Sequence, residues 1–254
     1  MNALGRTVLA LFLAAAGIRG AAEERVSVAA AANLVYVLDP LNAEFAKIEP
    51  QVVVTSAIGA SGSLVAQIGN GAPFDVFLSA DMDYPRKLIE AGGAPASSLV
   101  VFAVGKLVLW TTRPGLDLPS IETVVRSPSV AKLAIANPRL APYGRAAEEV
   151  LAKLGLTETA RPKLVYGENI TQTAQYVSSG NVDAGFVALS LVKSPKLKDQ
   201  GHWLEVPSGL YSPILQGGVL TSRGAANPAA RRYLDFLKSP GARAVFARFG
   251  YGAP

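Results

Sequence analysis

The sequence contains no cysteine and a single histidine, His202, among its 254 residues. The missing thiols exclude disulfide bonds, cysteine nucleophiles, thiolate metal sites and lipid attachment through an N-terminal cysteine. A zinc centre is not expected either, because one histidine leaves only carboxylates to complete the ligand set. Aromatic residues are few, and the only tryptophans are Trp110 and Trp203. This scarcity disfavours a protein that stacks sugar rings on aromatic faces.

Charge of one sign is also in short supply. The 24 Lys and Arg residues outnumber the 19 Asp and Glu residues by only five. Two of these cations, Arg6 and Arg19, lie ahead of residue 23, which leaves 22 against 19 and a net charge of +3 in the rest of the chain. Such a small and scattered excess does not predict a nucleic-acid-binding surface, so we expect no nucleic-acid partner.

The apolar run at the N-terminus, residues 8–18, is shorter than the roughly 20 residues that a bilayer-spanning helix needs. It follows Arg6 and ends in the small residues Gly20-Ala21-Ala22, before polar Glu23. This pattern is typical of a secretory signal peptide. We therefore predict a signal peptide over residues 1–22 and a mature, soluble chain that begins at Glu23.

Short β-branched or apolar runs alternate with helical patterns along the rest of the chain. The expected strands cover residues 26–30, 52–56, 74–78, 108–111, 133–136, 164–166 and 185–188. Helices between them indicate βαβ units and mainly parallel sheets. The clearest helix is predicted to start at Asn33 as N-cap and to kink at Pro40. A second helix is expected to start near Tyr143 and to end at the glycine cap Gly155.

Two apolar stretches, residues 98–112 and 212–220, are longer than the other expected strands, so we expect each of them to cross from one lobe into another. The sequence thus predicts an α/β fold of two lobes, each a mainly parallel sheet flanked by helices. Residues 23–105 plus 217–254 are expected to form the first lobe, and residues 106–216 the second. A ligand is expected between the lobes, where strand ends and helix starts converge.

Four turns from strand to helix share a chemical character, because each offers backbone N–H groups at a helix start. They are Ala31-Ala32-Asn33, Ala60-Ser61-Gly62-Ser63, Pro142-Tyr143-Gly144 and Glu168-Asn169-Ile170. Such a turn, together with the dipole of its helix, binds an anion without any cation. Asn and Ser are equally common as helix caps, so each turn alone also fits an ordinary cap.

Eight segments follow one another in a specific order along nearly the whole chain. They are residues 28–34, 59–64, 71–81, 136–138, 141–144, 185–190, 233–237 and 249–250. In this combination they resemble the periplasmic molybdate-binding proteins of ABC transporters. The resemblance implies a periplasmic binding protein fold and a monomer that is not an enzyme. It also implies that the protein captures molybdate or tungstate without a cofactor and delivers it to a membrane permease with its ATPase.

The resemblance further implies which residues hold the dianion. The side chain and backbone of Asn33, where many members have a serine, are expected to donate hydrogen bonds, with the N–H of Ala32 beside them. The hydroxyl and N–H of Ser61 come from the same lobe, and the N–H groups of Tyr143 and Ile170 come from the other. These donors contact the oxygens of molybdate, so no protein atom is expected to bind the metal directly.

One contact of the family is missing. Many members have a tyrosine hydroxyl at the position of Ala188, which cannot donate. The hydroxyl of Tyr143 or the side-chain amide of Asn33 is the expected replacement. Nearby charged residues receive no ligand role. Arg145 is expected to be a solvated side chain, and Asp75 and Asp81 are expected to cap or pair.

The identity of the anion stays open on the residues alone. Fully ionised molybdate, tungstate and sulfate need only donors, whereas phosphate at neutral pH carries a proton and needs an acceptor. Glu168 is the one carboxylate in the donor turns, which disfavours phosphate. Sulfate and molybdate differ in size, so only a cavity could separate them.

An exported hydrolase is the alternative from another class of protein. His202 is expected in a surface loop that enters a short strand, away from Ser61, and Ser61 lacks the G-x-S-x-G context of a nucleophile elbow. Ser190 and Lys193 match S-x-x-K, but the companion motifs are absent. Amino-acid binding would need an arginine and an acid for the two charged groups of that ligand.

Overall fold

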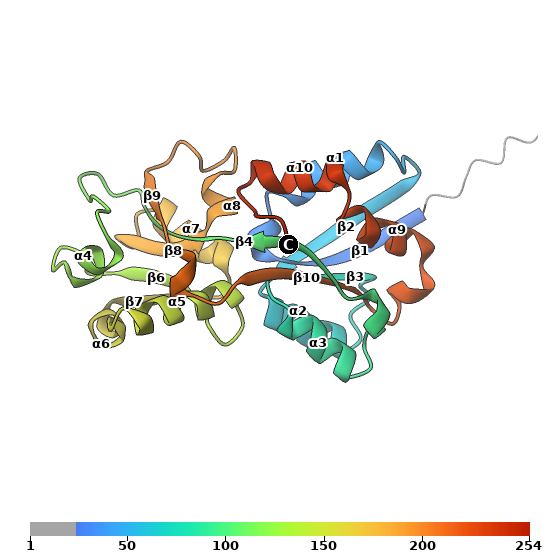
Figure 1. Ribbon diagram of the computed structural model, residues 1–254, viewed down its shortest axis with the longest axis horizontal. Helices are drawn as coiled ribbons and strands as arrows, with labels where there is room; N and C mark the ends of the chain where they lie inside the picture. Colours follow the sequence, from blue (N-terminus) through green and yellow to red (C-terminus); the bar gives the residue numbers. More distant parts are fainter. Residues whose placement is uncertain (1–23) are drawn as a thin grey trace, which may run out of the picture.

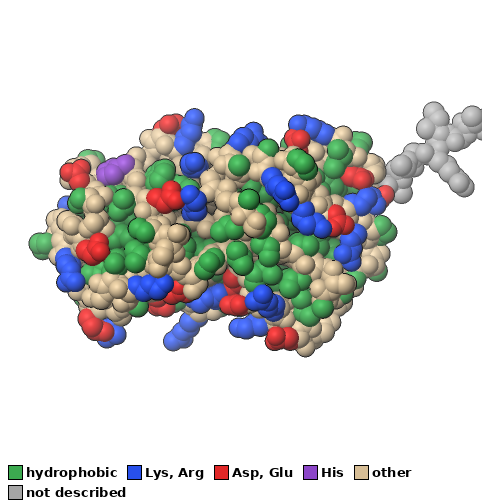
Figure 2. All heavy atoms as spheres, in the orientation of Figure 1, with side chains coloured by type: hydrophobic (Ala, Val, Ile, Leu, Met, Phe, Trp, Pro, Cys, Tyr) green, Lys and Arg blue, Asp and Glu red, His purple; other side chains and the backbone are tan. Residues whose placement is uncertain are grey.

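The computed structural model describes residues 24–254, so the predicted signal peptide and Glu23 lie outside the described residues. Two lobes lie side by side, and the chain crosses between them twice (Figure 1). Within residues 24–254 no helix has both the length and the apolar character that crossing a membrane requires. Figure 2 shows basic and acidic side chains interspersed over both lobes on the face in view.

The first lobe is built from both ends of the described chain. Its N-terminal part contains β1 (Glu24–Ala31), η1 (Ala32–Leu34), α1 (Leu38–Ala46), β2 (Val52–Gly59), α2 (Ser61–Gly69), β3 (Val76–Ser79), α3 (Asp83–Glu90), η2 (Ala96–Ser98) and β4 (Val100–Gly105). Its C-terminal part contains β10 (Ile214–Leu220), η5 (Gly224–Ala226), α9 (Pro228–Phe236) and α10 (Pro240–Arg248). The strand order is β2-β1-β3-β10-β4.

The second lobe is continuous in sequence. It contains β5 (Leu107–Thr111), α4 (Ile121–Arg126), β6 (Leu133–Ala136), α5 (Pro142–Lys153), α6 (Thr157–Ala160), η3 (Arg161–Lys163), β7 (Leu164–Gly167), α7 (Ile170–Ser178), β8 (Ala184–Ala188), α8 (Leu189–Val192), β9 (His202–Glu205) and η4 (Ser208–Leu210). The strand order is β7-β6-β8-β5-β9, so the two sheets have the same plan. Trp110 of β5 is fully buried in the core of this lobe.

Each sheet has one reversed strand. β10 pairs antiparallel with both of its neighbours in the first sheet, and β5 does so in the second. These are the strands that receive the chain from the other lobe. A strand that starts at the cleft must run away from it, whereas the strands of βαβ units run toward it. The predicted two-lobed α/β fold is confirmed, with sheets of mixed pairing.

Helices cover both faces of the first sheet (Figure 1). One face packs against α1, α9 and α10 through side chains such as Phe45 and Phe246, and the other packs against α2 and α3. Strand β1 is therefore buried on both sides, which explains its nearly continuous apolar run. The last residues also belong to the crossing region, because Gly252 forms an antiparallel bridge with Val104 at the end of β4.

The start of the first helix differs from the prediction. Asn33 lies inside the short helix η1 and its side chain caps nothing, because it is drawn into other hydrogen bonds described below. α1 begins only at Leu38, which leaves Pro40 in its first turn. A proline needs no N–H partner there, so the predicted kink is wrong. The second helix ends as predicted, with Gly155 at a φ of +64° just beyond α5.

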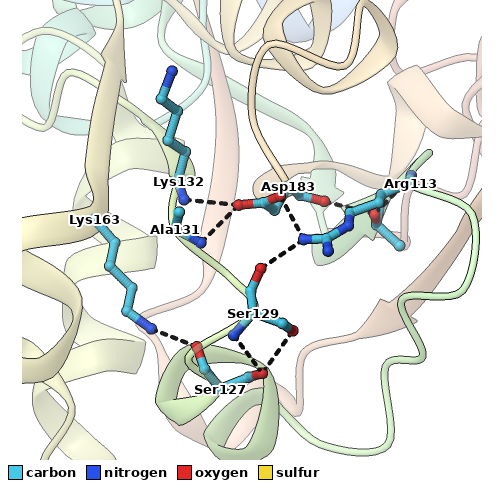
Figure 3. A network of polar contacts seen from close by, with 8 residues as sticks. Arg113, Ser127, Ser129, Ala131, Lys132, Lys163 and Asp183 are labelled. Atoms are coloured by element: carbon cyan, nitrogen blue, oxygen red, sulfur yellow. Dashed lines mark hydrogen bonds and ion pairs between the residues drawn. The ribbon is translucent and has the colours of Figure 1, made fainter.

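A polar network ties down the loop that follows α4 in the second lobe (Figure 3). The Asp183 carboxylate accepts hydrogen bonds from the backbone N–H groups of Ala131 and Lys132 and pairs with the Arg113 guanidinium at 2.7 Å. Lys163 donates to the carbonyl of Ser127 at 2.8 Å. Burial would raise the pKa of Asp183, but these backbone donors and Arg113 together lower it.

Candidate functional site

A small cavity lies between the lobes and holds about 10 Å³. Both lobes line it, through Ala31, Ala32, Asn33, Gly59, Ala60, Ser61, Ala80, Ala141, Pro142, Tyr143, Asn169 and Ile170. All five residues proposed from the sequence are thus brought together. A volume of this order accommodates about one water-sized sphere, so the closed cavity is too small for a sugar or an amino acid, and a tetrahedral oxyanion needs the groups of the wall to move outward.

The first lobe contributes two turns at the ends of β1 and β2. Ser61 is the first residue of α2, and its N-cap position is held by Ala60, which makes no side-chain cap. The Ser61 hydroxyl accepts a hydrogen bond from the N–H of Ala80 at 3.1 Å. This contact fixes the oxygen and leaves its proton for another acceptor. Ser61 is 1% exposed, so that acceptor must lie inside the cavity.

The second lobe contributes the starts of α5 and α7. Pro142 takes the first position of α5 and has no N–H, so Tyr143 supplies the first N–H of this helix. At α7 the side chain of Asn169 caps the N–H groups of Thr171 and Gln172, which leaves the N–H of Ile170 uncapped. Helix starts of this kind carry partial positive charge toward the cavity.

The backbone donors of the site are free. Among residues 24–254, the N–H groups of Asn33, Ser61, Tyr143 and Ile170 donate to no other backbone group. Buried N–H groups in folded proteins nearly always have an acceptor. No Asp, Glu, Lys or Arg lines the cavity. The arrangement therefore offers uncharged donors, aimed from four turns, to one small anion.

The side chain of Asn33 is the most constrained polar group of the site. Its amide nitrogen donates to Gln216 Oε1 at 2.8 Å and to the Tyr251 hydroxyl at 2.7 Å. Gln216 in turn donates to the carbonyl of Ile214 at 3.1 Å. Within the described residues Asn33 Oδ1 has no hydrogen-bond partner, although it is buried. An orphaned buried acceptor costs about 1–3 kcal/mol, so this amide is poised to change its contacts.

Tyr143 lines the cavity with a fully buried ring. Burial is the main cause that raises the pKa of its hydroxyl well above the usual value, so the side chain stays neutral. The hydroxyl lies against Gly105 at the end of β4, where any larger residue would overlap it. Ala188 is buried at the end of β8 and is not among the residues that line the cavity.

Hydrogen bonds hold the lobes together around this cavity. Thr171 Oγ1 of the second lobe donates to the carbonyl of Ala32 at 2.8 Å, and Ser190 Oγ donates to the carbonyl of Asn33 at 2.9 Å. On the opposite side, the N–H of Gly62 donates to the carbonyl of Leu140 at 2.9 Å. The lobes are therefore in a closed arrangement.

None of the three charged residues considered in the sequence analysis lines the small cavity. Asp75 pairs with Arg223 and accepts from the N–H of Ser27, and Asp81 pairs with Arg145. Pairing was predicted for both aspartates and is confirmed. The prediction that Arg145 is solvated is wrong, because its partner lies 64 residues away in the other lobe, which local sequence does not reveal.

The hydrolase alternative finds no geometric support. His202 is exposed on the edge strand β9, in the lobe opposite to Ser61. The Ser190 hydroxyl is engaged with the carbonyl of Asn33 and accepts from the Tyr251 hydroxyl. No group of three or more His, Asp or Glu residues in the described chain is arranged to hold a metal ion.

Sequence reasoning missed several apolar wall residues, namely Gly59, Ala80 and Ala141. They lie beside the donor turns, at strand ends or at an N-cap position, where small side chains let backbone N–H groups reach the cavity. Gly59 and Ala141 lie next to turns that the sequence analysis had singled out, whereas Ala80 follows β3 and lies only within the resembling segment 71–81. Their signal was the small residue type at a strand-to-helix junction.

Comparison with known proteins gives concordant matches. The sequence profile of a family described as bacterial extracellular solute-binding protein matches residues 26–252. The molybdate-binding protein ModA of Azotobacter vinelandii is 45% identical over 252 residues, which are 98% of this chain and 98% of that protein. ModA of Rhodobacter capsulatus is 43% identical over 97% of this chain and 95% of its own length.

A solved structure gives the same result. The periplasmic molybdate-binding protein of Azotobacter vinelandii superposes with a TM-score of 0.84 at 37% identity. The match covers 90% of this chain and 99% of that one. Both lobes and the cavity between them therefore fall within the shared structure.

Proposed function

This chain belongs to the family of bacterial extracellular solute-binding proteins, and we propose that it captures one molybdate ion between its lobes and delivers it to a membrane ABC importer. The observation that carries the proposal is the set of free, uncharged backbone donors around one small interlobe cavity, and the choice of molybdate among the oxyanions is supported by the molybdate-binding relatives. Neutral dipoles match the charge of a dianion without a permanent counter-charge, so the ion can still leave.

The proposed ligand contacts are those expected from the sequence. The N–H groups of Asn33, Ser61, Tyr143 and Ile170, with that of Ala32, donate to the oxygens of molybdate, and the Ser61 hydroxyl adds its free proton. The metal is reached only through these oxygens. Tungstate has the same shape and charge and is expected to bind in the same way. No cofactor takes part, and the protein acts as a carrier without catalysing a reaction.

The Asn33 side chain requires one rearrangement on binding. As it stands, both amide protons are engaged and only an acceptor, Oδ1, is unpaired, which repels an anion. We propose that the amide turns over when the ion enters. Its NH₂ group then faces the ion, and Oδ1 accepts from the Tyr251 hydroxyl, which no longer donates to the Asn33 carbonyl or Ser190 Oγ. The Gln216 amide has to turn over at the same time and give up its bond to the Ile214 carbonyl, because its Oε1 would otherwise face Oδ1. The contact of the NH₂ group with the ion stands in for the hydroxyl that Ala188 lacks.

The proposed cellular setting follows from the family and from the N-terminal pattern. The signal peptide over residues 1–22 directs export, and the mature protein acts in the periplasm as an unlipidated monomer without a nucleic-acid partner. Its lobes open and close about the crossings near residues 106 and 213, which lead from β4 to β5 and from η4 to β10. The closed, loaded form docks on a permease, whose ATPase drives uptake.

Calorimetry on the mature chain from Glu23 tests the proposal with molybdate, tungstate, sulfate and phosphate. We expect tight one-to-one binding of molybdate and tungstate and weak binding of the other two. Ser61→Ala should weaken binding by about tenfold or more, since a hydrogen bond to a charged group contributes about 1.5–3 kcal/mol. Ser63→Ala is the matched control, because Ser63 lies on the same helix but does not line the cavity.

Two variants at Asn33 test the turned amide. Asn33→Ser keeps a donor and should retain most of the affinity, whereas Asn33→Asp cannot donate and adds a negative charge. Abolished binding in Asn33→Asp with near-normal binding in Asn33→Ser supports the contact. A folded protein that ignores molybdate and tungstate, or binds sulfate equally well, rejects the molybdate assignment.

A further inference from the structure

An ion pair joins the lobes beside the proposed molybdate site. The Arg145 guanidinium of α5, in the second lobe, contacts the Asp81 carboxylate that follows β3 in the first lobe. Asp83 lies at 3.7 Å from the same guanidinium. Arg145 also lies over the Tyr84 ring, with 5.4 Å between its central carbon and the ring centroid. One cation of the second lobe thus meets three groups of the first.

Asp81 is held ready for this contact by its own lobe. Its Oδ1 accepts from the Ser79 hydroxyl at 2.9 Å and from the N–H of Tyr84 at 3.2 Å. Its Oδ2 is the atom that faces Arg145. The carboxylate therefore keeps its place when the lobes separate, and only the contact with Arg145 is lost.

The surroundings strengthen the pair. The side chain of Asp81 is 12% exposed and that of Arg145 is 35% exposed. Burial alone would lower the pKa of Arg145, but Asp81 and Tyr84 together outweigh it and the net shift of the pKa is upward. The Tyr84 hydroxyl donates to the carbonyl of Arg139 at 2.9 Å, which adds a second bond between the lobes at the same place.

The ion pair lies next to the small cavity in which molybdate is proposed to bind. A second interlobe cavity of about 280 Å³ is lined by Asp81, Arg145 and the more exposed Asp83 and Arg86. Ala80 and Pro142 line both this cavity and the small one. The two cavities therefore adjoin at Ala80 and Pro142, and the ion pair lines the larger cavity beside the small one.

Building on the proposed function, we propose that Arg145 and Asp81 form a latch that sets how long the bound oxyanion stays between the closed lobes. The pair forms only when the lobes meet, so it stabilises the closed form. It leaves the hydrogen-bond donors that contact the ion unchanged. Neither residue contacts the ion. Both are positioning residues, which act on the rate of opening.

A latch changes the dissociation rate of molybdate, whereas a purely electrostatic role changes its association rate. Arg145→Gln and Asp81→Asn both remove the pair, so both should raise the dissociation rate of molybdate, by roughly fivefold to tenfold for a partly exposed pair. Electrostatic steering of the incoming dianion depends instead on the charge of the residues beside the cleft. The association rate should fall in Arg145→Gln and rise in Asp81→Asn.

The experiment measures release of radiolabelled molybdate after a chase with excess unlabelled ion, together with association rates at low and high salt. Arg86→Gln is the matched control, because it removes an equal charge from the rim of the same cavity without breaking the pair. The double variant Arg145→Gln/Asp81→Asn should release the ion no faster than either single variant, since both remove one interaction. Dissociation rates within twofold of wild type in both single variants overturn the latch.

Failure of the proposed function would look different. If the wild-type protein binds no molybdate, the latch is judged on ligand-free protein by small-angle X-ray scattering. Both single variants should then shift toward an expanded, open form, whereas Arg86→Gln should match wild type. Equal scattering from all four proteins refutes the latch independently of the ligand.

Discussion

Gly62 is the residue at which closure leaves no room for a single methyl group. It is the second residue of α2, and a Cβ atom there would lie 2.7 Å from the Tyr84 hydroxyl and 3.1 Å from the Cα of Leu140. Carbon atoms in favourable contact are about 3.5–4.0 Å apart. Tyr84 cannot move aside freely, because its hydroxyl is bound to the carbonyl of Arg139. Gly62→Ala therefore has to push the lobes apart.

The cost of that separation follows from the contacts it breaks. Moving the Leu140 segment by about half an ångström weakens two hydrogen bonds of 2.9 Å, from the Gly62 N–H and from the Tyr84 hydroxyl. At about 0.5–1.5 kcal/mol each, closure loses about 1–3 kcal/mol. This corresponds to a fivefold to 150-fold weaker affinity for molybdate, at about 1.4 kcal/mol for each factor of ten.

Folding and closure respond in opposite directions to this substitution. Alanine is favoured over glycine inside a helix by about 0.5–1 kcal/mol, so the ligand-free protein should melt no earlier than wild type. Calorimetric titration with molybdate measures the affinity, and thermal unfolding without ligand measures the stability. Gly69→Ala, at the end of the same helix with nothing within 4 Å, is the control and should bind normally. Unchanged affinity in Gly62→Ala would refute the reasoning, as would an equal loss in Gly69→Ala.

Two further substitutions probe other parts of the molecule. Gly105→Ala should displace the Tyr143 hydroxyl and lower molybdate affinity at least tenfold by titration, whereas Gly209→Ala, in open space, should not. Asp183→Asn should lower the free energy of unfolding by about 1–3 kcal/mol near neutral pH, because three donors lose a carboxylate. The pKa of Asp183 is lowered by folding, so its contribution is complete above the unfolded pKa of about 3.9 and is lost as pH falls through the folded value. Urea unfolding at several pH values should show the two proteins converging in acid, and a constant difference would contradict this account.

The donor turns were predictable because strand ends and helix starts leave a local trace. Ser61 and Tyr143 each lie at the start of a helix that follows a strand, so the pattern identified their turns, and the family resemblance predicted that these turns face one cleft. The side chain of Asn33 was not, because its partners Gln216 and Tyr251 lie 183 and 218 residues away. A helix cap is a contact between neighbouring residues, so the local sequence can predict it. A hydrogen bond to a residue far along the chain cannot be predicted in this way.

The direction of the strands was predicted only in part, because it also depends on contacts that the local sequence does not show. Apolar runs predicted most strands, and the rhythm of strands and helices predicted parallel pairing. The reversal of β5 and β10 depends on the side from which the chain enters each lobe. Residues 98–112 and 212–220 were expected to cross between lobes. A strand that enters a lobe from the cleft runs opposite to its neighbours, so this expectation already implied the reversal.

The bridge between Gly252 and Val104 has a consequence for how the protein is made. Synthesis proceeds from the N-terminus, so β1, β2 and β3 emerge long before β10 can insert between β3 and β4. Tyr251, whose hydroxyl supports both Asn33 and Ser190, emerges almost last. A chain that is still being synthesised therefore lacks the strand that joins β3 to β4 in its first sheet, and it lacks the residue that supports its binding site. The proposed binding site is complete only once both β10 and Tyr251 have emerged.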